Sequence, residues 1–114
     1  MKTRLIFLIV SIFYANVSFA TNLEKYDIAT RCNFASYELL KITGSEYVNK
    51  VSLDWLHKVY FYRDELIVRS EWNDSNLSQR EMQNREEILY LIDVFGAKST
   101  YFNQLQCHKY LKSI

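Results

Sequence analysis

The chain has 114 residues, of which 14 are Lys or Arg and 13 are Asp or Glu. Without Lys2 and Arg4 of the first twenty residues, 12 basic residues stand against 13 acidic ones, a net charge of −1. This balance argues against nonspecific binding to nucleic acid or to an anionic membrane surface. We therefore expect neither of these partners.

Residues 1–20 have the form of a secretory signal peptide. A basic start is followed by an apolar run, and Ser18 and Ala20 are the small residues that precede a cleavage site. The apolar run is shorter than a helix that spans a membrane usually requires. The alternative to a cleaved signal peptide is an uncleaved membrane anchor. We expect residues 21–114 to form a single exported domain, periplasmic or secreted, with no membrane span after cleavage.

The first expected helix covers residues 23–43 and ends at Gly44, which adopts the left-handed conformation without strain. Its apolar residues recur at helical spacing and predict one buried stripe. The stripe consists of Ile28, Cys32, Ala35, Leu39 and Ile42.

The second expected helix covers residues 46–70. Its apolar stripe consists of Val48, Val51, Trp55, Val59, Tyr62 and Leu66. A β-hairpin near residues 59–68 is the alternative, because that stretch is rich in aromatic and β-branched residues. Since no glycine-rich or Asn-Gly turn lies within it, the helix is favoured.

Two further helices are expected, at residues 78–95 and 99–111. Ser78 and Glu81 form a capping box at the start of the third helix. Its predicted stripe consists of Met82, Leu89, Ile92 and Phe95, and Ile88 and Leu91 make its second half apolar nearly all round, so that half is expected to be the most buried. The last helix offers Tyr101, Phe102, Leu105 and Cys107 for burial. The sequence therefore predicts an all-α, four-helix domain, with an α+β fold as the alternative.

The two cysteines, Cys32 and Cys107, both lie in the exported part of the chain. An even number of cysteines in an oxidising compartment predicts a disulfide between them. Such a bond would join the first helix to the last. Two buried thiols or an intermolecular bridge are the alternatives.

Four aromatic residues are the best candidates for binding a partner protein: Tyr60, Phe61, Tyr62 and Trp72. Three consecutive aromatic side chains on a helix spread over about 200°, so one core face cannot take them all. Exposed aromatic residues are typical anchors of protein interfaces. Packing in a second core layer is the alternative.

No set of residues forms a complete catalytic or metal site, and we expect no cofactor, metal or catalytic residue. Asp54 and His57 share a helix face, but this pair supplies at most half of a metal site. Cys107 and His108 resemble the end of a haem-attachment motif, whose first cysteine is replaced by Gln104.

The sequence favours a non-enzymatic protein-binding module with an inhibitor, immunity or chaperone-like role. In size, export signal and single disulfide, the chain is similar to small periplasmic acid-stress chaperones and secretion-system immunity proteins, but no motif assigns it to either. The alternatives are a small exported enzyme or metal-binding protein that uses Asp54 and His57, and a carrier of apolar ligands.

Overall fold

The computed structural model describes residues 21–69 and 72–114, and within these ranges every regular element is helical. The signal peptide predicted at residues 1–20 lies outside the described residues. The elements, in chain order, are α2 (Asn22–Thr43), α3 (Glu46–Val68), α4 (Asp74–Phe95), α5 (Ala97–Ser99), the π-helix η3 (Thr100–Gln104) and α6 (Cys107–Tyr110). The all-α prediction is confirmed, and the alternative hairpin is wrong because its residues belong to α3.

Helices α2 and α3 form an antiparallel pair joined by a two-residue turn. Gly44 ends α2 in the left-handed conformation, with a φ of 60°, and its N–H donates to Leu40 O at 2.8 Å. Ser45 then caps α3, because its hydroxyl accepts the N–H of Val48 at 3.4 Å. Both ends of the turn are thus satisfied by the residues that the sequence places there.

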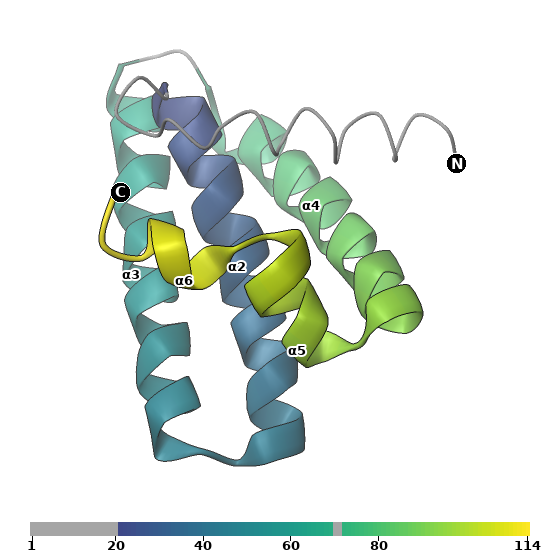
Figure 1. Cartoon of the computed structure of the whole chain (residues 1–114). Helices are drawn as coiled ribbons and strands as arrows, with labels where there is room; N and C mark the ends of the chain where they lie inside the picture. The colour runs from purple at the N-terminus through teal and green to yellow at the C-terminus, as the bar shows by residue number, and fades with distance from the viewer. Residues whose placement is uncertain (1–20, 70–71) are drawn as a thin grey trace.

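Helix α2 lies at the centre of the molecule and contacts every other element (Figure 1). Helix α3 packs on one side of it and α4 on the other, while the C-terminal segment, residues 97–114, crosses over it. The stripe predicted on α2 is buried at Ile28, Cys32, Ala35 and Leu39. Ile42 is the exception, with 73% of its surface exposed, because it lies in the last turn beyond these contacts.

Helix α4 begins four residues earlier than Ser78, so the predicted capping box is wrong. Asn73 is the N-cap, and its side-chain oxygen accepts the N–H of Asn76 at 2.8 Å. Asn is among the strongest N-cap residues, and Asp74 places a negative charge in the first turn, where the helix dipole favours it. The carboxylate of Glu81 instead pairs with Arg63.

The buried face of α4 agrees with the prediction only in part. Ile88 and Leu91 are buried as expected, but Met82, Leu89 and Phe95 are exposed and Ile92 is half-buried, and the other buried residues of α4 are Leu77 and Asn84. The reason is that α4 meets α2 partly through polar contacts, which an apolar pattern does not reveal. A buried asparagine at this helix interface means that hydrogen bonds, as well as apolar packing, position α4.

The single helix predicted at 99–111 is wrong, because three short elements occupy this region. In η3 the N–H of Leu105 donates to Thr100 O at 2.9 Å, a spacing of five residues. Gln106 then adopts the left-handed conformation, with a φ of 54°, which few residues other than glycine adopt. The chain therefore turns sharply before α6.

This turn brings Cys107 against the middle of α2. The disulfide Cys32–Cys107 is present as predicted, with the two Cα atoms 5.6 Å apart. Both cysteines are buried, and they lie among the core residues of α2 and the C-terminal segment. The bond therefore fixes the short C-terminal elements to the central helix.

Candidate functional site

An open groove runs along the outer side of α3 where the C-terminal residues meet it. Its volume is about 540 Å³. We call it the α3 groove, and its lining residues are Asp54, His57, Lys58, Phe61, Tyr62, Leu111 and Ile114. These residues bring part of the predicted aromatic cluster together with the predicted Asp54/His57 pair.

The three adjacent aromatic residues of α3 point in different directions. Phe61 is 58% exposed and Tyr60 is 55% exposed, whereas Tyr62 is 8% exposed and belongs to the core. The rings of Phe61 and Tyr62 contact each other edge to face, with centroids 5.1 Å apart. Phe61 therefore stands on the rim of the groove and is supported from below by a buried neighbour.

Trp72, the fourth predicted anchor, occupies a different position. It is half-buried against the core, and the guanidinium of Arg80 lies 5.5 Å from the centre of its ring. Neither Trp72 nor Tyr60 is among the residues that line the α3 groove. Of the four predicted residues, only Phe61 is both strongly exposed and part of the groove.

The polar side chains of the groove come from three residues within about one turn of α3. Asp54 and His57 line it as predicted, and Lys58 donates from Nζ to the backbone oxygen of Ile114 at 2.9 Å. In residues 21–69 and 72–114, no cluster of three His, Cys, Asp or Glu side chains is suited to hold a metal ion. Asp54, His57 and Lys58 thus give the groove a polar edge of mixed charge beside an apolar wall.

A buried polar cluster joins α2 to α4 away from the groove. Arg80 donates from Nε to Asp27 Oδ1 at 2.7 Å, and Asn84 donates to the same oxygen at 3.1 Å. Arg31 donates from Nε to Asn84 Oδ1 at 3.3 Å. The side chain of Asp27 is only 4% exposed, so this ion pair stands in a largely dry setting.

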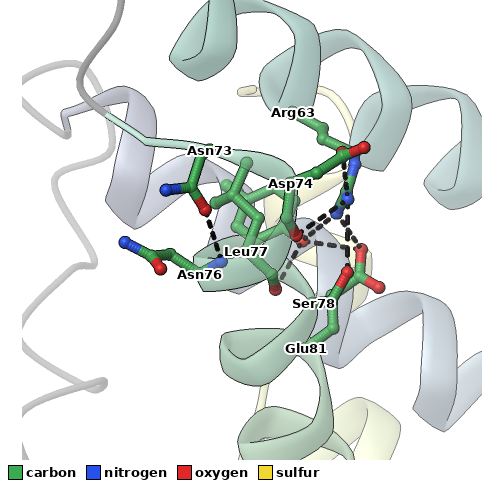
Figure 2. A network of polar contacts seen from close by, with 8 residues as sticks. Arg63, Asn73, Asp74, Asn76, Leu77, Ser78 and Glu81 are labelled. Atoms are coloured by element: carbon green, nitrogen blue, oxygen red, sulfur yellow. Dashed lines mark hydrogen bonds and ion pairs between the residues drawn. The ribbon is translucent and has the colours of Figure 1, made fainter.

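A second polar network holds the start of α4 against α3 (Figure 2). Arg63 donates to Asp74 Oδ1 at 2.6 Å and to Glu81 Oε1 at 3.4 Å. The hydroxyl of Tyr26 donates to the same Glu81 oxygen at 2.6 Å. Burial, together with the bond to Glu81, raises the pKa of Tyr26 above its ordinary value.

These two networks were not predicted, because nothing in the sequence indicates that their residues contact one another. Arg31, Arg80 and Asn84 have ordinary positions in helices, and only the packing of α4 on α2 brings them to Asp27. Every one of the contacts described is between side chains of the protein itself. They are therefore best understood as positioning α4, and the α3 groove is the candidate site.

None of the helices in the described ranges has the length and apolar character needed to cross a membrane. Comparison of the chain with family models, curated proteins and solved structures gives no match.

Proposed function

We propose that this protein is an exported, non-enzymatic helical module that binds another protein through the α3 groove. The observation that carries the proposal is the position of Phe61 at the edge of a groove with apolar walls. The side chain of Phe61 is 58% exposed to solvent. Export is supported by the disulfide Cys32–Cys107, because such bonds persist mainly in oxidising compartments.

The composition of the groove suits a protein partner. Phe61, Leu111 and Ile114 provide apolar surface, and Asp54 and Lys58 provide both signs of charge at its edge. An exposed aromatic residue inside a polar rim is the usual arrangement of an interface anchor. An apolar side chain of the partner would enter the groove, and polar groups around it would meet the rim.

Site-directed photo-crosslinking tests where the partner binds. A benzophenone amino acid in place of Phe61 is expected to link the partner covalently in the cell envelope of the source organism. The matched control is the same replacement at Val68, which is exposed near the end of α3 and does not line the groove. A product that forms equally at both positions would contradict a specific site at the groove.

A pair of alanine variants then measures the contribution of the side chain. Phe61→Ala is expected to weaken partner binding by more than about 1 kcal/mol, or roughly fivefold in Kd, and to change stability by less than about 0.5 kcal/mol. Phe95→Ala is the control, because Phe95 is also exposed but lies at the end of α4. If Phe61→Ala reduced stability by about 3 kcal/mol, Phe61 would be a core residue and the proposal would fail.

Export is tested separately by the intact mass of the protein recovered from outside the cytoplasm. The expected mass corresponds to a chain that begins at Thr21. A mass that retains residues 1–20 would instead support an uncleaved anchor.

A further inference from the structure

A second hollow lies between α2, α3 and the C-terminal segment. It shares Leu111 with the α3 groove, and its other lining residues are different. Its volume is about 230 Å³, and it is more enclosed than the groove. We call it the C-terminal cavity. Its apolar lining includes Leu39 from α2, Val48 and Val51 from α3, and Phe102 and Leu111 from the C-terminal segment.

The size and lining of the cavity suit a small apolar group. An apolar cavity of about 150 Å³ can hold a benzene ring, so a volume of about 230 Å³ admits a group on the order of eight non-hydrogen atoms. Ser36, Tyr47, Tyr101, His108 and Lys112 also line the cavity, so its apolar surface is the wall formed by the other five lining residues. A short hydrocarbon chain or a single ring would restore the contacts that the walls otherwise lack.

The basic residues that line the cavity favour a ligand with a negative charge. His108 and Lys112 are both exposed, and both belong to its lining. No aspartate or glutamate is among the lining residues. A ligand with an apolar tail and a negative head group would therefore place the tail among the apolar residues and the head near Lys112.

The irregular C-terminal backbone is what forms this wall. Gln106 reverses the chain after η3, and the disulfide at Cys107 holds the next residues against α2. His108 then packs its ring on Phe102, with the centroids 5.3 Å apart. The left-handed conformation of Gln106, which is rare for a residue other than glycine, thus shapes the backbone that carries His108 and Leu111 into the cavity wall.

We propose that the C-terminal cavity binds a small amphipathic carboxylate whose apolar tail, of about eight non-hydrogen atoms, lies inside and whose carboxylate lies at Lys112 and His108. This site does not depend on the protein-binding role of the α3 groove. It also gives a physical basis to the apolar-ligand carrier expected as an alternative from the sequence.

Three probes of equal chain length test the charge of the ligand: octanoate, octanol and octylamine. Titration of the full oxidised protein, followed by calorimetry and by NMR of the methyl groups, is expected to show octanoate binding at least tenfold more tightly than octylamine. The methyl signals of Leu39, Val48 and Val51, which line the cavity but not the α3 groove, should move together. Equal binding of all three probes, or shifts confined to Ile114 in the α3 groove, would overturn the proposal. Competition between octanoate and 3-phenylpropionate then decides between a linear and an aromatic tail.

Two variants with matched controls test the position of the ligand. Val48→Phe fills the cavity and is expected to weaken octanoate binding at least tenfold, whereas Val94→Phe, at an exposed site on α4, leaves it unchanged. Lys112→Glu is expected to weaken octanoate binding at least tenfold without affecting octanol, and Lys98→Glu on α5 is its control. If Val48→Phe prevents folding, the exposed Lys112→Glu variant decides, and unchanged octanoate binding there refutes the site.

Discussion

Removal of the disulfide is expected to destabilise the protein strongly, because the bond closes most of the described chain into one loop. Cys32 and Cys107 are 75 residues apart in sequence. The chain-entropy relation for a loop of 75 residues gives about 4 kcal/mol of stabilisation at 25 °C, an upper value because reduced chains retain some structure. For a domain of this size, the same free energy corresponds to a fall in Tm of about 16–32 °C.

The assay is thermal unfolding followed by far-UV circular dichroism for three samples. These are the oxidised protein, the same protein in reductant, and the double variant Cys32→Ala, Cys107→Ala. Reductant should lower the Tm of the first protein and leave the double variant unchanged, which separates the bond from any other effect of the reagent. If the oxidised and reduced proteins melted within about 4 °C of each other, the bond would contribute no more than about 1 kcal/mol and the loop argument would be wrong.

Three further predictions concern the polar contacts. Burial raises the pKa of the Tyr26 hydroxyl in the folded protein, so on raising the pH the unfolded chain loses the phenolic proton first. The contribution of Tyr26 to the free energy of unfolding is therefore complete below about pH 10 and should decline above it. Urea unfolding at alkaline pH should show a smaller decline for Tyr26→Phe. Asn73→Ala removes the N-cap of α4 and should lower the free energy of unfolding by about 1 kcal/mol, whereas Asn76→Ala in the same turn should leave it nearly unchanged in urea denaturation. Asp27→Ala removes the carboxylate that pairs with Arg80 and should lower the free energy of unfolding by about 3 kcal/mol. The control Asp93→Ala, at an exposed position, should lower it by less than about 0.5 kcal/mol. Equal effects of the two variants in chemical denaturation would show that the ion pair does not position α4.

The sequence predicts α2 and α3 well because the apolar stripe of each helix is largely buried, although α2 also buries Asp27, Thr30, Arg31 and Ser36. Val51, Trp55 and Val59 recur at helical spacing, and all three are buried. Caps at Gly44 and Ser45 mark the turn between the two helices with residues whose backbone preferences are strong. Pattern and packing agree here, so the boundaries follow from the sequence alone.

On α4 the prediction is right for Ile88 and Leu91 but wrong for the stripe that begins at Met82, because part of the buried face of this helix is polar. Asn84 is buried through its bonds to Asp27 and Arg31, whereas Met82 remains in solvent. Periodicity of apolar residues cannot identify a face of this kind. The signal at Asn73 was available, since Asn followed by Asp is a good helix start, but the capping box at Ser78 competed with it.

The candidate site was predictable only in part. Three adjacent aromatic residues cannot share one core face, so the exposure of at least one was expected, and Phe61 is exposed. The contribution of Leu111 and Ile114 to the groove was not predictable, because it depends on the turn at Gln106. A left-handed glutamine has no signal in the sequence comparable to that of a glycine.

The central position of α2 has a consequence for the order of events during synthesis. Because the chain is made from its N-terminus, α2 exists before any of the elements that pack on it. At about 5–20 residues per second, Cys107 follows Cys32 by roughly 4–15 s, given their separation of 75 residues. Until then Cys32 is a thiol whose partner has not been made, and other thiols can compete for it. Elongation of the chain therefore sets a lower limit on the time at which the bridge can close, and under the proposed export the passage of Cys107 into the oxidising compartment adds to it.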